Sequence, residues 1–394
     1  MKLNAAFLQD PEFQHVMQVI EGSGRRAYVV GGAVRNALLS RPIADIDIAT
    51  DARPEEVIAL AAKAGLGCAP TGIAHGTVTI VSGPASFEIT TFRRDVATDG
   101  RRATVAFTDR LEEDAQRRDF TMNGLYATRT GDVIDPVDGL SDLEARRLRF
   151  IGDPASRIRE DYLRILRYFR FLATVASAVA PGGIEAITSE ASGLDQVSGE
   201  RIGAEMRKIL GAPDPRRALA LMHESGALDM VFPCADISAL PELLRNERRY
   251  HAKADWRLRL SLISRDAQID RLKLSGSEKS HLQLLAALPG TSLDEAAYRH
   301  GEDIARSHAL LHLARNPFPL EADWPARIQR ASRLKLPIRS SDLMPGLAGK
   351  ELGMGLREAE AHWIASGFTA EPEDLIGVAR GSRPLEDEIP TPAS

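Results

Sequence analysis

Two aspartates, Asp45 and Asp47, lie one residue apart in the segment GGAVRNALLSRPIADIDIAT, which spans residues 31–50. Alternating apolar and polar residues over 43–49 predict a β-strand, on which both carboxylates project from the same face. Two like charges held close together are unfavourable unless a cation neutralises them, and Mg²⁺ prefers carboxylate and phosphate oxygens. The pair therefore indicates the metal site of a phosphoryl or nucleotidyl transferase, although a solvent-facing acidic strand edge has the same pattern.

A glycine pair, Gly31 and Gly32, follows a short apolar run over 27–30 and precedes a helix predicted over 34–39. Glycines let the backbone approach a phosphate closely, and the helix start offers unpaired N–H groups and a positive dipole end. The chain has neither the GKS or GKT of a Walker A loop nor a GxGxxG motif. A glycine pair, a helix and a strand bearing Asp-x-Asp, in that order, are more specific for phosphate chemistry than any of them alone.

A third carboxylate, Glu88, lies in the second strand of a hairpin predicted over 76–81 and 86–92. If that strand neighbours the one bearing Asp45 and Asp47, Glu88 completes the metal site or activates an attacking hydroxyl. An ordinary acidic residue on a strand is the alternative.

The elements that must position these residues change in character along the chain. The first ~140 residues mix short strands and helices, as expected of one compact catalytic domain. Strand signals then give way to helical periodicity over 161–173, 199–210, 218–228, 277–287 and 293–314. The sequence therefore predicts the α+β class, with an all-α remainder.

The charge and cysteine content restrict the setting in which the protein works. The formal net charge of −5 alone argues against a nucleic-acid binder, but residues 141–170 carry eight arginines against five acids. The two cysteines, Cys68 and Cys234, form no metal-type spacing and no disulfide framework, which is typical of the cytoplasm. No apolar run approaches the ~20 residues of a membrane span, so we expect no membrane partner.

The motifs GGAVRN…ADID, FEITTFRRD, RRDFTMN and REDYLRILRYFRF occur in an order that resembles bacterial class II tRNA nucleotidyltransferases and their poly(A) polymerase relatives. The resemblance covers residues 28–171, and a weaker likeness extends over 341–368. It departs from the family at Asn36, where Asp is usual, at Ala103-Thr104, where Pro is common, and in lacking the phosphohydrolase domain of some members.

The resemblance implies a polymerase-β-like nucleotidyltransferase head followed by an all-α neck, body and tail. The corresponding boundaries are 1–140 for the head, 141–215 for the neck, 216–320 for the body, 321–382 for the tRNA-binding tail and 383–394 for a disordered end.

The resemblance also assigns site residues. Asp45 and Asp47 match the positions that hold Mg²⁺, and Glu88 joins them as a catalytic candidate. The nucleotide-binding positions are Gly31, Gly32, Arg35, Arg117, Arg118, Asp119, Asn123, Glu160, Asp161, Arg164 and Arg167. Arginine suits a triphosphate because its planar fork binds phosphate bidentately, and Asp119 and Asn123 can bind sugar hydroxyls.

Asp161 and Arg164 are spaced to share one face of a helix and to select the incoming base. Aspartate accepts a hydrogen bond and arginine donates one, which matches the Watson–Crick edges of both cytosine and adenine. Guanine and uracil present the reverse order, and each unmatched buried polar group costs ~1–3 kcal/mol. Glu160 would orient the arginine, and Arg167 would hold phosphate or stack on the base. A surface salt bridge is the alternative for this helix.

These features favour CCA addition to the tRNA 3′ end from CTP and ATP, with a flexible loop over 93–109 accompanying the change from C to A. Poly(A) addition and partial CC or A addition remain open within the family. A non-catalytic RNA-binding protein and a small-molecule nucleotidyltransferase are the alternatives from other classes. The sequence does not specify an oligomeric state.

Overall fold

The structure is a computed structural model that describes residues 1–99, 102–264, 268–316 and 318–381. The chain divides into two compact units. The first comprises Met1–Leu240 with Lys253–Lys279, and the second comprises Pro241–Ala252 with Ser280–Ser394, which the structure describes as far as residue 381.

A mixed sheet forms the centre of the head. In the described part of the chain it has seven strands in the order β3-β4-β5-β2-β1-β8-β9. Their bounds are Ala27–Val30 (β1), Asp47–Thr50 (β2), Gly67–Gly72 (β3), Thr77–Ser82 (β4), Ala85–Thr91 (β5), Tyr126–Ala127 (β8) and Val133–Ile134 (β9). β1 pairs antiparallel with β2, which pairs parallel with β5. The predicted hairpin is confirmed as β4 and β5.

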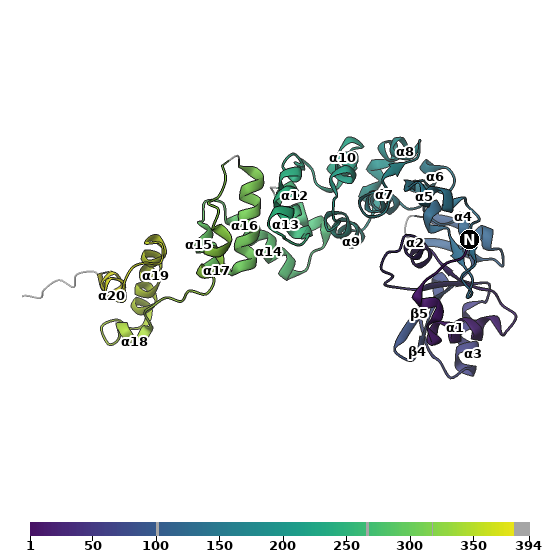
Figure 1. The fold of residues 1–394 in the computed structure, drawn as a ribbon, viewed down its shortest axis with the longest axis horizontal. Coiled ribbons are helices and arrows are strands. Elements are labelled where there is room, and N and C mark those ends of the chain that lie inside the picture. Colours follow the sequence, from purple (N-terminus) through teal and green to yellow (C-terminus); the bar gives the residue numbers. More distant parts are fainter. Residues whose placement is uncertain (100–101, 265–267, 317, 382–394) are drawn as a thin grey trace, which may run out of the picture. The chain divides into compact units, whose positions relative to one another are not determined.

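Five helices accompany the sheet: α1 (Pro11–Glu21), α2 (Gly32–Leu38), α3 (Pro54–Lys63), α4 (Leu111–Gln116) and α5 (Gly139–Glu144). α1 and α3 pack against one another and against β4, as Figure 1 shows at the purple end of the chain. The apolar stripe of α1 is fully buried at Phe13, Val16, Met17 and Ile20. Asp10 caps this helix by accepting from the backbone N–H groups of Glu12 and Phe13.

The segment predicted as a flexible loop contains regular structure. β6 (Arg93–Asp99) and β7 (Arg102–Phe107) pair antiparallel as a two-stranded ribbon, so the prediction of a plain loop is wrong. Residues 100 and 101 lie outside the described chain.

Helices dominate the remainder of the first unit. They are α6 (Pro154–Glu160), α7 (Leu163–Thr174), α8 (Gly183–Glu190), α9 (Gly199–Leu210), α10 (Arg216–Glu224), α11 (Ala227–Val231) and α13 (Trp256–Ile263). The prediction that this region is all-α is wrong in one detail, because β10 (Arg147–Leu148) and β11 (Ala178–Val179) form a short parallel pair. The helix predicted over 161–173 begins at Leu163, after a break at Asp161 and Tyr162.

An aromatic cluster fixes α7 against the head. The Phe120 ring lies 5.4 Å from that of Phe171 in an edge-on contact, and Phe150 stacks on Tyr168 at 5.4 Å. All four rings are buried. These contacts place the arginines of α7 beside the short 3₁₀ helix Thr121–Asn123.

The other helices are α12 (Leu240–Arg249), α14 (Gly276–Ala287), α15 (Leu293–His300), α16 (Glu302–Arg315), α17 (Trp324–Ala331), α18 (Ser340–Leu343), α19 (Gly349–Ala365) and α20 (Pro372–Gly381). The helix predicted over 293–314 is interrupted at Gly301, whose φ is +85°. α18 to α20 enclose a core of their own around Trp363. Together with the sheet-based head, these helices confirm the predicted α+β class. Across the described ranges, no helix is both long and apolar enough to cross a membrane.

Candidate active site

The glycine pair forms the turn between β1 and α2. Gly31 has a φ of +69°, which suits glycine, and its N–H donates to the carbonyl of Leu125 at 3.1 Å. A Cβ on Gly31 would lie 3.7 Å from both the Arg118 guanidinium and the Asn123 carbonyl. The turn therefore lies in ordinary contact with Arg118 and Asn123, and its positive φ is the reason for a glycine at position 31.

Asp47 and Glu88 lie opposite one another on the parallel strands β2 and β5. Partial desolvation raises the pKa of Asp47, Glu88 and Asp45 raise it further, and Arg118 lowers it. The pairing of β2 with β5 thus confirms the prediction that Glu88 lies beside Asp47. The predicted strand over 43–49 is wrong at its start, because β2 begins at Asp47 and Asp45 lies exposed in the preceding segment.

Asp119 and Asn123 are held in a buried polar network. The Asn123 amide donates to Asp119 at 2.9 Å, and Nε of Arg167 donates to the other Asp119 oxygen at 2.8 Å. Burial alone would raise the pKa of Asp119, but Arg167 and these hydrogen bonds lower it to about 2. Arg35 donates to the Asn123 side-chain oxygen, so any sugar hydroxyl bound here must share these partners.

Arg35 lies next to Asn36, whose side-chain oxygen accepts from Nε and NH2 of Arg35 at 3.1 and 2.9 Å. Burial lowers the pKa of Arg35 to about 10, with neighbouring Arg170 contributing in the same direction. Asn36 is neutral, so it accepts hydrogen bonds from Arg35 without offsetting the positive charge. This region of the cavity therefore favours an anionic ligand.

Asp114 on α4 holds the arginine pair of RRDFTMN. Arg117 and Arg118 donate to its two oxygens at 2.8 and 2.9 Å, and the Tyr126 hydroxyl donates at 2.7 Å. Burial alone would raise the pKa of Asp114, but Arg118 and Arg117 lower it to about 2. The sequence interpretation missed Asp114, although its spacing of three and four residues from the arginines on a helix was the available signal.

Asp161 lies between α6 and α7, not on a helix face. Its backbone is extended, with φ −157° and ψ +103°, and its side chain accepts from the Leu163 N–H at 3.1 Å, as a helix-capping residue does. Arg201 of α9 donates to both carboxylate oxygens at 3.1 and 2.7 Å. The predicted shared helix face of Asp161 and Arg164 is therefore wrong, because Asp161 is held by capping and by Arg201.

Arg164 is held as the sequence interpretation proposed. Its guanidinium donates to Glu160 and, at 2.7 Å, to the carbonyl of Arg157, and a third bond reaches the carbonyl of Arg117 at 3.3 Å. Its side chain is 11% exposed. The orientation of Arg164 is thus fixed by the protein before any nucleotide binds.

Three guanidiniums surround the ring of Phe171. Those of Arg35, Arg167 and Arg170 lie 5.0, 5.7 and 4.1 Å from its centroid. Arg170 also donates to the buried Glu205 of α9 at 2.6 Å. Phe171 therefore gathers positive charge beside the glycine turn.

One cavity of about 530 Å³ collects most of the predicted site. The predicted residues that line it are Gly31, Gly32, Arg35, Asp47, Arg117, Arg118, Asp119, Asn123, Asp161, Arg164 and Arg167. Asp45, Glu88 and Glu160 are not among the lining residues. The residues that sequence interpretation missed are Arg93, Leu163, Arg170, Phe171 and Arg201. Among the described residues this lining contains eight arginines and three aspartates, as expected for a polyanionic ligand.

Comparison with known proteins agrees with this geometry. Residues 27–149 match the family model "Poly A polymerase head domain", and residues 178–237 match "Probable RNA and SrmB- binding site of polymerase A". The solved structure of the Bacillus stearothermophilus CCA-adding enzyme in complex with CTP is 30% identical, with a TM-score of 0.73. The similarity covers 95% of this chain and 97% of that one. The chain belongs to the family of CCA-adding enzymes.

Curated relatives support the same family. CCA-adding enzymes of Streptococcus gordonii and Geobacillus stearothermophilus are 44% and 42% identical over 225 and 221 residues. These alignments span 56% and 55% of this chain and about 55% of the length of those relatives. These matches confirm the predicted fold, in which a polymerase head domain is followed by helical regions.

Proposed function

We propose that the protein is a CCA tRNA nucleotidyltransferase, which adds C, C and A to the tRNA 3′ end from CTP and ATP without a nucleic-acid template. One observation carries this proposal: the base-selecting pair Asp161 and Arg164 lines the same cavity as the glycine turn and Asp47. A base and its triphosphate can therefore be held together in one pocket.

The base end of the pocket selects by hydrogen-bond direction. Arg164 offers donors in an orientation fixed by Glu160 and two carbonyls, and Asp161 offers acceptors in an orientation fixed by Arg201. Cytosine and adenine match this order, whereas uracil and guanine leave two groups unmatched. Each unmatched group costs ~1–3 kcal/mol, so the pair supplies at least about a thirtyfold preference.

The phosphate end combines the turn at Gly31 and Gly32 with the guanidiniums around Phe171. Arg35 has a neutral neighbour in Asn36 and a lowered pKa, so an incoming triphosphate supplies the missing negative charge. Asp119 and Asn123 lie beside it to bind the ribose hydroxyls.

The donor chemistry around Asp47 fits Mg²⁺ held by Asp45 and Asp47. Carboxylates of Glu88 and Asp45 raise the pKa of Asp47, and a divalent cation offsets this repulsion. Nowhere in the described chain are three or more His, Cys, Asp or Glu side chains placed to hold a metal ion by themselves, so triphosphate oxygens supply further ligands. When bound, the metal activates the nucleophile and neutralises charge on the leaving group.

The transfer step exchanges a phosphoanhydride bond of the nucleotide for a phosphoester bond to the RNA. The RNA 3′-hydroxyl oxygen attacks the α-phosphorus of CTP or ATP, and the bond from that phosphorus to the bridging oxygen breaks. Pyrophosphate leaves with the bonding electron pair, and Glu88 accepts the hydroxyl proton. The arginines of the pocket hold the leaving pyrophosphate in place.

The helical regions serve the RNA in this proposal. We assign the head to residues 1–140, the neck to 141–215, the body to 216–320 and the tRNA-binding tail to 321–382. Action on tRNA places the protein in the cytoplasm. The RNA-binding family model that matches residues 178–237 supports an RNA partner for the helical part.

One assay distinguishes full CCA addition from its alternatives. The protein is incubated with tRNA transcripts that lack the whole CCA end, lack only the final A, or are complete, and each labelled nucleotide is supplied separately. We expect C then A on the first transcript, A on the second and nothing on the third. Addition of A alone to every transcript would indicate a poly(A) polymerase. Incorporation no greater than that of Asp45→Ala would exclude catalysis.

A further inference from the structure

A second cavity of about 530 Å³ lies in the head, away from the glycine turn. In the pairing of β1 with β2, Val30 lies opposite Asp47 at one end, and Ala27 lies opposite Thr50 at the other end. Arg25 precedes β1, and Asp51 and Arg53 follow β2, so the second cavity opens at the ends of these strands opposite Asp47. We call it the distal pocket.

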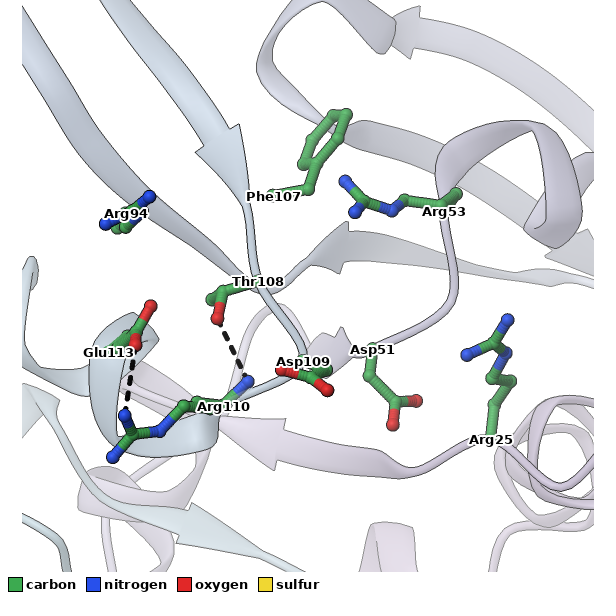
Figure 2. A pocket seen from close by; sticks show the side chains of 9 residues that line it. All are labelled: Arg25, Asp51, Arg53, Arg94, Phe107, Thr108, Asp109, Arg110 and Glu113. Carbon is green, nitrogen blue, oxygen red and sulfur yellow. Dashed lines mark hydrogen bonds and ion pairs between the residues drawn. The ribbon is translucent and has the colours of Figure 1, made fainter.

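The base of the β6–β7 ribbon forms the opposite wall of the distal pocket. Arg94 lies near the start of β6 and Phe107 ends β7. Arg110 precedes α4, and Glu113 lies within it (Figure 2). The Arg53 guanidinium carbon lies over the Phe107 ring, 4.9 Å from its centroid. Figure 2 shows the two side chains next to each other. The Phe107 ring also packs against Gly76, where a Cβ would approach it to 2.6 Å. The pocket therefore presents a fixed ring covered by a planar guanidinium.

Two guanidiniums of this pocket are available to a ligand. Across the residues that the structure describes, Arg53 and Arg94 form no ion pair, and both residues are exposed. Arg25 and Arg110 do form ion pairs, with Glu56 at 2.8 Å and Glu113 at 3.4 Å, but these pairs lie at the surface. Exposed ion pairs contribute ~0–1 kcal/mol, so a phosphate can compete for these arginines as well.

The charge of the distal pocket differs from that of the nucleotide pocket. Its described lining carries four arginines against three acidic residues, whereas the nucleotide pocket carries eight arginines against three aspartates. An excess of one positive charge matches a single phosphodiester, and an excess of five suits a triphosphate, which carries about four negative charges. The distal pocket therefore fits a polymer unit better than a free nucleotide.

A third cavity, of about 390 Å³, adjoins both pockets. It shares Arg94 and Arg110 with the distal pocket and Arg117 with the nucleotide pocket. The described lining of the third cavity has four arginines and three glutamates, so the three cavities form a polar track along α4 with an excess of arginine. Such a track suits a strand that continues from one pocket to the next, which a free nucleotide does not do.

We propose that the distal pocket holds one nucleotide of the RNA substrate outside the transfer site. Its phosphodiester binds Arg94 and Arg53, and its base stacks on the exposed Arg53 guanidinium that covers the Phe107 ring. Arginine planes and aromatic rings are the surfaces on which proteins stack unpaired RNA bases. The proposal rests on RNA being the substrate of the proposed function.

The test measures RNA affinity of the full chain for Arg53→Gln, Arg94→Gln and the double variant. The probes are a tRNA transcript that lacks CCA and a short unstructured RNA, each titrated at about 50 and about 200 mM KCl. We expect each single variant to bind both probes about fivefold more weakly, and the salt dependence of log Kd to fall by about one unit in the double variant. Lys63→Gln, which removes an exposed cation on α3 outside the pocket, should leave both quantities unchanged.

The binding of CTP in the absence of RNA separates the possible outcomes. Unchanged CTP affinity together with weakened RNA binding supports the proposal. Unchanged RNA affinity and salt dependence, a loss confined to CTP, or a wild-type protein that binds neither RNA overturns it. If the wild type adds no nucleotides but the variants still weaken RNA binding, the proposed function fails while the distal pocket stands.

Discussion

Under the proposed function, Arg201 links α9 to base selection by holding Asp161. It donates to both oxygens of Asp161 from 40 positions away in the sequence, and the two side chains are 31% and 26% exposed. Without Arg201 the Asp161 carboxylate keeps, among its described partners, only the hydrogen bond from the Leu163 N–H and is held less firmly in the geometry that matches cytosine and adenine.

We predict that Arg201→Ala lowers the ratio of kcat/KM for CTP over that for UTP by about tenfold. Most of the loss should appear as slower CTP incorporation, measured on a tRNA transcript that lacks CCA. Arg159→Ala is the matched control, because Arg159 pairs with Glu190 at the surface and is 56% exposed. An unchanged CTP/UTP ratio in Arg201→Ala would show that capping alone orients Asp161.

Asp114 makes the stability of the head depend on pH. Its pKa is about 2 in the folded protein, below the usual value of 3.8, because Arg118 and Arg117 outweigh the effect of burial. A lowered folded-state pKa adds stability above the unfolded-state pKa, and this stability is lost as pH falls from about 4 to about 2. The contribution is about 2 kcal/mol.

We predict that Asp114→Asn destabilises the protein at pH 7 by about 3–5 kcal/mol, because Arg117 and Arg118 lose their counter-charge. Urea unfolding at pH 7, 4 and 3 should show that the difference from wild type shrinks as pH falls. Glu113→Gln is the control, since its ion pair with Arg110 is exposed. A difference that stays constant with pH would contradict the assignment of the acid-sensitive step to Asp114.

At the scale of elements, α9 owes its position to glycines that let a neighbouring backbone approach. A Cβ at Gly203 would lie 2.3 Å from the carbonyl oxygen of Leu272, so the 3₁₀ helix Gln268–Leu272 packs directly on α9. Gly203→Ala must therefore displace the helix that carries Arg201.

We predict that Gly203→Ala lowers the free energy of unfolding by about 2–3 kcal/mol and reduces the CTP/UTP ratio with it. Chemical denaturation and single-nucleotide incorporation measure the two effects. Gly276→Ala in α14 is the control, because its Cβ would meet nothing within 4 Å. Loss of stability with an intact CTP/UTP ratio would uncouple the packing of α9 from base selection.

Elements defined by local patterns were the ones that sequence interpretation placed best. The helix predicted over 199–210 and the hairpin β4–β5 agree with the structure, because their apolar periodicity and turn residues are local signals. The pairing of β6 with β7 was missed because this polar, arginine-rich segment has little apolar alternation. The break at Asp161 was missed because no proline or glycine marks it.

Site residues held by long-range partners were the ones that sequence could not supply. The glycine turn, Asp47 and Arg164 followed from type and spacing, and the structure brings them to one cavity. Arg201 and Phe171 join that cavity only through packing of α7 and α9. Their roles depend on tertiary contacts, for which one sequence carries no periodic signal.

At the scale of the whole molecule, the chain consists of two compact units. Both family-model matches and every lining residue of the nucleotide pocket lie in the first unit. The second unit has a separate core, in which the Trp363 ring contacts Phe368 at 4.9 Å and Tyr298 at 5.5 Å. Nucleotide binding should therefore survive damage to the second unit. Under the proposed function, in which residues 321–382 bind tRNA, tRNA binding should weaken.

Trp363 is only 4% exposed, so its replacement by alanine leaves a cavity in the core of the second unit. We predict that Trp363→Ala destabilises this unit by about 3–5 kcal/mol. Hydrogen exchange should show faster exchange in α18 to α20 and unchanged protection in the sheet of the head. CTP affinity should stay within about twofold of wild type, and tRNA affinity should fall about tenfold or more. Phe318→Ala is the control, because Phe318 is 75% exposed. Lost protection in the head sheet would mean that the units fold together, and tRNA binding would then depend on the head through folding as well as contact.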